Sequence, residues 1–132
     1  MTCILYVEDH PASRRVMELL VVEVLGIEPL YMLDSSENVV MEIEALPEQP
    51  DIIFLDINLK PLTGYEVQSL LREHDDYRHK KIIALTASAT AADMRQMREA
   101  GFDGAIEKPL SHMTFPQQIQ RILDGQTVWE TA

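Results

Sequence analysis

The chain has 132 residues, of which 46% are hydrophobic and 25% are charged, and its net charge is −11 at pH 7. This length fits one domain, and the apolar content is enough for one core, which argues against global disorder. The acidic balance repels a phosphate backbone, so direct nucleic-acid binding is not expected. A single cysteine, Cys3, permits no internal disulfide and suits a reducing cytosol. No apolar run reaches the roughly 18–20 residues of a membrane span, and no signal peptide is evident.

Five short apolar runs predict β-strands. Most of them are nearly continuous in apolar residues, which is typical of strands buried on both faces of a parallel sheet. Pro29 lies inside the second run, and because proline cannot donate to a sheet ladder, we expect this strand at an edge. The predicted strands cover residues 3–7, 27–33, 51–56, 82–86 and 104–107.

Segments with helical periodicity separate these strands. We expect helices from Pro11 to about residue 25, after the capping residues 34–36, after Gly64, over about 90–100, and after Pro116. Five β/α units predict a doubly wound α/β fold, in which helices cover both faces of a parallel sheet. We expect the domain to span residues 1–125 and the tail, residues 126–132, to be too short for an element that matters to the fold.

Chemically useful side chains follow four of the predicted strands. Glu8 and Asp9 end the first strand, Asp56 the third, Thr86 the fourth, and Lys108 follows the fifth. In open α/β sheets the functional crevice lies at the carboxyl ends of the strands, so these groups should converge. Clustered carboxylates repel one another, and a hard cation with oxygen ligands relieves this repulsion. Magnesium, usually shared with a phosphate, is the expected ion.

The same groups suit phosphoryl transfer. An aspartate is a competent nucleophile toward phosphorus, and Asp56 can therefore form an aspartyl-phosphate. The Lys108 ammonium and the Thr86 hydroxyl can contact phosphoryl oxygens, so that catalysis consists mostly of positioning and electrostatics. Any one of these residues alone is commonplace at a protein surface; the prediction depends on all four strand ends carrying suitable groups.

With these motifs in view, the chain resembles the response-regulator receiver family of two-component signalling. The resemblance rests on Glu8-Asp9, Asp56 with Gly64 eight residues later, Leu85-Thr86-Ala87, Ala100-Gly101 and Lys108-Pro109, and it covers residues 3 to about 124. It implies a flavodoxin-like (βα)5 fold with sheet order 2-1-3-4-5, consistent with the edge position inferred from Pro29.

The resemblance also implies roles for the residues. Asp56 is expected to be the phospho-acceptor, Lys108 to contact the phosphoryl group, and Thr86 to be the switch hydroxyl. Asp9, Asp56 and the backbone carbonyl of Asn58 are expected to bind Mg2+ directly, with Glu8 acting mostly through water. The Lys108-Pro109 peptide is expected to be cis. The implied partners are a sensor histidine kinase or a histidine phosphotransfer protein, a downstream protein, and neither nucleic acid nor membrane.

Three positions depart from the family pattern. Glu8 replaces the commoner aspartate. The proline expected four residues after the acceptor is Lys60, with Pro61 one position later, which predicts a differently shaped and more positive loop. The switch aromatic expected three residues before the lysine is Ala105, which leaves room that a partner side chain can fill.

The expected protein is a stand-alone cytoplasmic receiver that catalyses only its own phosphorylation and dephosphorylation, and acts as a phosphorelay shuttle or binds partners directly. Ala105 keeps open a second class, a receiver that binds proteins without being phosphorylated. A hydrolase of the D-x-D type is disfavoured because Asn58 stands where its second aspartate is needed. A flavin module is disfavoured because the first loop is acidic rather than rich in Ser, Thr and Gly.

Overall fold

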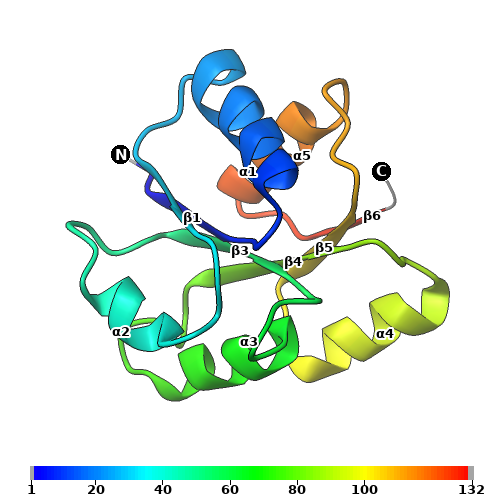
Figure 1. The fold of residues 1–132 in the computed structure, drawn as a ribbon. Helices are drawn as coiled ribbons and strands as arrows, with labels where there is room; N and C mark the ends of the chain where they lie inside the picture. The colour runs from blue at the N-terminus through cyan, green and yellow to red at the C-terminus, as the bar shows by residue number, and fades with distance from the viewer. Residues whose placement is uncertain (1, 131–132) are drawn as a thin grey trace.

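The structure of the protein, a computed structural model, describes residues 2–130. A parallel sheet with the strand order β2-β1-β3-β4-β5-β6 forms the central layer (Figure 1). The strands are β1 (Ile4–Val7), β2 (Leu30–Leu33), β3 (Ile52–Asp56), β4 (Lys81–Thr86), β5 (Gly104–Glu107) and β6 (Val128–Glu130). The order of the first five strands is the predicted 2-1-3-4-5, and β2, which begins directly after Pro29, lies at the edge as expected.

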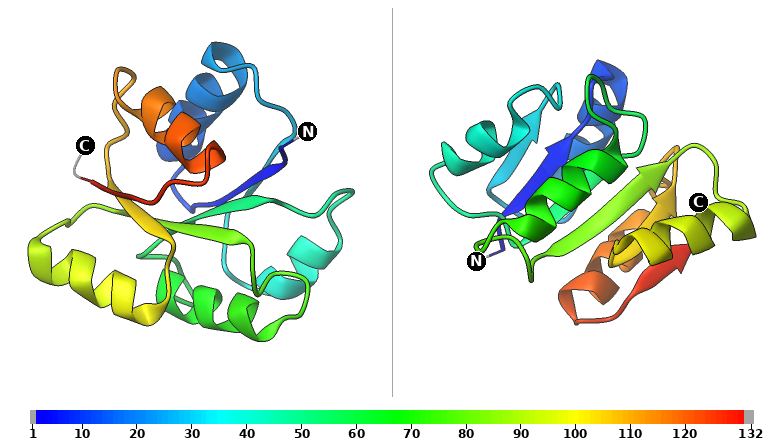
Figure 2. Two further views of the ribbon diagram at one scale, coloured as in Figure 1. Left: turned by 180° about the vertical axis from the view of Figure 1, so that it is seen from behind. Right: turned by 90° about the horizontal axis from the view of Figure 1, so that it is seen from below.

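Helices cover both faces of the sheet. On one face lie α1 (Pro11–Glu18), its π-helical continuation η1 (Leu19–Val24) and α5 (Phe115–Leu123); on the other lie α2 (Val39–Glu44), α3 (Gly64–Glu73) and α4 (Ala91–Ala100) (Figures 1 and 2). The central strands β1 and β3 are wholly buried. Their alternate side chains enter two separate hydrophobic clusters, because successive residues of a strand point to opposite faces. This explains the nearly continuous apolar runs in the sequence.

Local signals fix the ends of α3 and α4. Thr63 and Thr90 are N-caps, and each forms a reciprocal capping box with an acidic residue three positions later, Glu66 and Asp93. Gly101 ends α4 with a φ of 107°, a left-handed conformation that favours glycine. The helix predicted from Pro11 to about residue 25 is present, but its second half is π-helical rather than α-helical.

The prediction that residues 126–132 contain no element that matters to the fold is wrong, because residues 128–130 form a sixth strand of the sheet. Strand β6 pairs in parallel with β5, and Val128 is completely buried in the α1/α5 cluster. The absence of a side chain at Gly104 allows this approach, since a Cβ atom there would lie 2.6 Å from the Val128 carbonyl oxygen. Arg121 forms an ion pair with Glu130, and Gln118 donates a hydrogen bond to the same carboxylate.

The prediction that Ala105 leaves open space for a partner side chain is also wrong, because Trp129 of β6 lies beside it. Ala105 is completely buried, and Trp129 is its partner in the register of β5 and β6. The indole packs against the cluster under α3 and α4, and the Arg98 guanidinium lies 4.6 Å from the ring centroid. Such a cation–π contact typically contributes about 0.5–1 kcal/mol when exposed. A side chain of the same chain therefore covers Ala105. Within residues 2–130 no helix combines the length and apolarity needed to cross a membrane.

Candidate phospho-acceptor site

Glu8, Asp56 and Lys108 meet at the carboxyl ends of β1, β3 and β5, as the sequence predicted. Lys108 Nζ lies 2.8 Å from Glu8 Oε1 and 3.0 Å from Asp56 Oδ1. Glu8 is completely buried and Asp56 is 2% exposed. The Lys108-Pro109 peptide is cis, as expected, and the Lys108 backbone N–H donates to the Thr86 carbonyl oxygen at 2.7 Å. The backbone of Lys108 is thus hydrogen-bonded to β4, while its ammonium group contacts the two carboxylates.

The pKa values of the two carboxylates beside Lys108 shift in opposite directions. Burial raises the pKa of Asp56, and the charge of Glu8 adds to the rise, while the Lys108 ammonium offsets part of it. Burial also raises the pKa of Glu8, but hydrogen bonds from Lys108 and Tyr6 outweigh it and leave that pKa lowered. Burial lowers the pKa of Lys108, but the contacts with the two carboxylates raise it by more. The pKa of Lys108 is therefore raised overall, and the ammonium form is favoured.

Tyr6 is a member of this site that the sequence did not reveal. It is completely buried in β1, and its hydroxyl donates to Glu8 Oε1 at 2.8 Å. Burial and the charge of Glu8 raise the pKa of Tyr6, so the phenol keeps its proton and remains a donor. The available signal was its place two residues before Glu8, which puts both side chains on the same face of the strand.

The acidic loop after β1 has the donor set for a hard cation. Carboxylate oxygens of Glu8 and Asp9 and a ring nitrogen of His10 lie within 4.8 Å of one another. Among the described residues, the buried atom Asp9 Oδ1 has no hydrogen-bond partner, and the buried atom Asp56 Oδ1 has only the Lys108 ammonium, at 3.0 Å. Buried polar atoms without partners are uncommon and require a reason. These oxygens fit Mg2+, for which the exposed imidazole of His10 is the poorer ligand.

The loop between Asp56, the last residue of β3, and Gly64, the first residue of α3, packs closely against the start of α3. The Gly64 backbone N–H donates to the Ile57 carbonyl oxygen at 3.0 Å, and a Cβ atom at Gly64 would lie 2.5 Å from the Asp56 carbonyl oxygen. Only glycine allows this approach, which explains its place eight residues after Asp56. Asn58 is exposed in the same loop, and the coordination of its carbonyl stays a prediction.

The Thr86 hydroxyl is hydrogen-bonded to the loop that follows β4. Its hydroxyl donates to the Ser88 carbonyl oxygen at 2.9 Å and accepts from the Ser88 N–H at 3.1 Å. The Ser88 hydroxyl donates to Asp93, the acidic member of the α4 capping box, at 2.6 Å. Thr86 is therefore connected through one loop residue to the N-terminus of α4.

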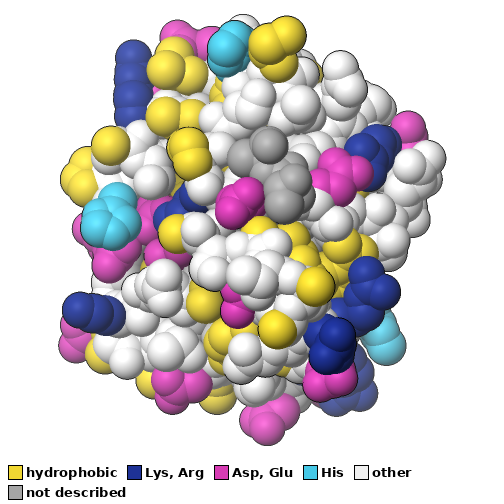
Figure 3. Space-filling view, turned by 90° about the vertical axis from the view of Figure 1, so that its right-hand side faces the viewer, with side chains coloured by type: hydrophobic (Ala, Val, Ile, Leu, Met, Phe, Trp, Pro, Cys, Tyr) yellow, Lys and Arg dark blue, Asp and Glu magenta, His cyan; other side chains and the backbone are white. Residues whose placement is uncertain are grey.

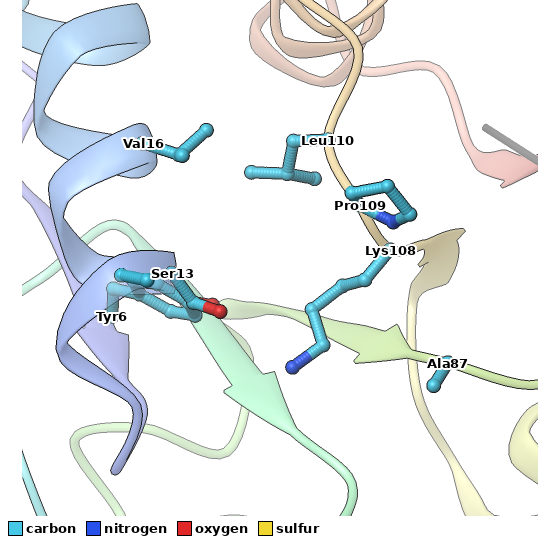
Figure 4. A pocket seen from close by; sticks show the side chains of 8 residues that line it. Tyr6, Ser13, Val16, Ala87, Lys108, Pro109 and Leu110 are labelled. Carbon is cyan, nitrogen blue, oxygen red and sulfur yellow. The ribbon is translucent and has the colours of Figure 1, made fainter.

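A pocket of about 400 Å³ opens beside the lysine, between α1 and the segment after β5. Lys108 extends into it from one side, with Tyr6 and Ser13 opposite, and Val16 and Leu110 form its apolar part (Figure 4). Val16 is 39% exposed. The pocket therefore lies on the α1 side of the lysine.

Comparison with known proteins shows to which protein family the chain belongs. The family model described as the response regulator receiver domain matches residues 4–120, so the chain belongs to this family of two-component signalling domains. It is 31% identical to the polar-differentiation response regulator DivK of Brucella anthropi, over 91% of this chain and 94% of that protein. It is 34% identical to a nitrate/nitrite response regulator homolog of Haemophilus influenzae, over 95% of this chain but only 58% of that protein.

Solved structures agree with this classification. A receiver domain of a sensor histidine kinase from Pseudomonas aeruginosa, with a magnesium ion coordinated in its active-site cleft, superposes with a TM-score of 0.76 at 30% identity, covering 94% of this chain and 95% of that one. The chemotaxis response regulator CheY4 of Vibrio cholerae superposes with a TM-score of 0.81 at 21% identity, covering 92% of this chain and 98% of that one, and supports the fold.

Proposed function

We propose that this receiver domain accepts a phosphoryl group on Asp56 from a phosphohistidine of a sensor kinase or histidine phosphotransfer protein. The observation that carries the proposal is the buried Asp56 carboxylate, whose Oδ1 atom lies 3.0 Å from the Lys108 ammonium and has no other polar partner among the described residues. A carboxylate placed in this way is available as a nucleophile and has a cation beside it for the arriving phosphoryl oxygens.

The transfer forms one bond and breaks another. An Asp56 carboxylate oxygen forms a new bond to phosphorus, the phosphorus–nitrogen bond of the phosphohistidine breaks, and the imidazole leaves with the electron pair and takes up a proton. Asp9, Asp56 and Glu8 are the residues that would hold Mg2+, whose charge balances that of the phosphoryl oxygens. Lys108 contacts one of these oxygens, and the pocket along α1 admits the donor.

Acetyl phosphate with Mg2+ tests the acceptor role without a cognate kinase. The wild-type protein should be phosphorylated, whereas Asp56→Asn, a nearly isosteric change, should not. A correctly folded wild-type protein that stays unmodified at saturating acetyl phosphate and Mg2+ would favour the alternative, a receiver that binds its partners without phosphorylation.

The output of the phosphorylated domain is proposed to pass through α4 to β6. When Thr86 turns toward the phosphoryl group, it leaves Ser88, and the contact of Ser88 with Asp93 at the start of α4 is disturbed. Arg98 on the same helix stacks on Trp129, so a shift of α4 reaches the sixth strand. The face of the molecule that Figure 3 shows, the right-hand side in Figure 1, carries hydrophobic side chains among charges of both signs, which suits a protein partner.

Trp129 makes this route measurable because it is the only tryptophan of the chain. Beryllofluoride with Mg2+ should change its fluorescence and alter amide exchange in residues 86–105 and 128–130, and Asp56→Asn should abolish both changes. Changes confined to the loops around Asp56 would mean that this face is not the output. The first helix, around Arg14 and Arg15, would then be the better candidate.

A further inference from the structure

Tyr6 places its hydroxyl at the carboxyl end of β1, beside Glu8 of the proposed phospho-acceptor site. Its ring is wholly buried in the cluster beneath α1 and α5, where aliphatic side chains and Phe54 surround it. Apolar packing alone needs no hydroxyl at this position. The oxygen instead reaches the carboxyl end of the strand and donates to Glu8 at 2.8 Å.

Few groups hold the Glu8 carboxylate in place. Its Oε1 atom accepts from Tyr6 and from Lys108, both at 2.8 Å, and its Oε2 atom accepts from the His10 N–H at a long 3.4 Å. The carboxylate is completely buried, and a buried charge needs donors of this kind. Of the two short contacts, only the one from Tyr6 comes from a completely buried side chain, since the side chain of Lys108 is 16% exposed.

We infer that Tyr6 is a positioning residue for phosphoryl transfer: it fixes Glu8, and Glu8 in turn holds the Lys108 ammonium against Asp56. The Tyr6 hydroxyl lies 2.8 Å from Glu8 Oε1, this oxygen lies 2.8 Å from Lys108 Nζ, and Lys108 Nζ lies 3.0 Å from Asp56 Oδ1. These contacts connect the core to Asp56 without a gap. The inference rests on the proposed function. It also gives the glutamate at position 8 a role, because an aspartate is one methylene shorter and should draw the carboxylate away from the Tyr6 hydroxyl.

The competing explanation is that Tyr6 only fills the core and its hydroxyl uses the nearest acceptor. In that case, removing the hydroxyl changes the stability of the domain but leaves the rate of phosphorylation unchanged. The positioning role predicts a change in rate that depends on the residue at position 8. These two expectations differ in a measurable way.

The test is the rate of Asp56 phosphorylation by acetyl phosphate at saturating Mg2+. Tyr6→Phe should slow it about tenfold, since a hydrogen bond to a charged group is lost from the reacting arrangement. Tyr77→Phe is the matched control, because Tyr77 is also a buried tyrosine but lies in the loop after α3. Its rate should equal that of the wild type.

A double-mutant cycle separates positioning from packing. In a Glu8→Asp background, Tyr6→Phe should slow the reaction less than about twofold, because the contact it removes is already absent. A wild-type rate in Tyr6→Phe, or an equal slowing in both backgrounds, overturns the inference. If Tyr6→Phe does not fold, an unchanged rate in Glu8→Asp alone overturns it. Absence of phosphorylation in the wild type would instead refute the proposed function.

Discussion

The sixth strand offers a quantitative test, because one side chain accounts for much of its packing. Val128 is completely buried, and Val128→Ala removes two methyl groups from the α1/α5 cluster. The lost transfer free energy is about 1.6 kcal/mol at roughly 0.8 kcal/mol per buried carbon. A residual cavity of ~40 Å³ adds about 1 kcal/mol. The free energy of unfolding should therefore fall by about 2.5 kcal/mol.

Thermal and urea denaturation measure this loss. For a domain of this size, 2.5 kcal/mol corresponds to a fall of about 9 °C in Tm, taking about 2.1 cal/mol/K of unfolding entropy per residue. Val24→Ala is the matched control, because Val24 is 63% exposed in η1 and its truncation should change stability by less than about 0.5 kcal/mol. Equal small effects of the two substitutions would refute the packing of β6 described above.

Three further predictions concern the acidic site. Mg2+ should raise the Tm of the wild type by relieving carboxylate repulsion, and Asp9→Ala should lose most of this gain; an equal gain in both proteins would contradict the metal assignment. Because burial raises the pKa of folded Asp56, its ionisation destabilises the fold as pH rises through that pKa. Asp56→Asn should therefore stabilise the metal-free protein at pH 7, and in urea titrations the gain should shrink as pH falls toward the ordinary aspartate pKa of about 3.9 and be absent below it; a gain independent of pH would exclude this cause. Lys108→Ala should slow phosphorylation by acetyl phosphate at least tenfold, and a wild-type rate would remove the lysine from the proposed mechanism.

The sequence predicted those parts of the fold and site that depend on periodicity and strand ends. Four buried strands read as continuous apolar runs, and Pro29 marked the edge strand. The carboxyl ends of parallel strands share one rim, so the meeting of Glu8, Asp56 and Lys108 followed from topology alone. Gly64, noted in the sequence through the family resemblance, and Gly101, noted as the end of a helix, each meet a specific backbone requirement in the structure.

The features that the sequence did not predict depend on contacts between distant residues. Strand β6 has only three residues, too few for a periodic signal, and is fixed by Gly104, Arg98 and Arg121. The Tyr6–Glu8 hydrogen bond depends on how far a phenol reaches along its strand, which strand periodicity does not specify. The π-helical turn after α1 has no sequence signature of its own.

The most direct test of the central claim is to locate the phosphoryl group. The wild-type protein is incubated with acetyl phosphate and Mg2+, the acyl phosphate is reduced with borohydride to homoserine, and the modified residue is identified by peptide mass spectrometry. The account predicts homoserine at position 56 and no modification of Asp9 or Glu8. Homoserine at another position, or none in a protein that is folded and binds Mg2+, would contradict the assignment of Asp56 as the acceptor.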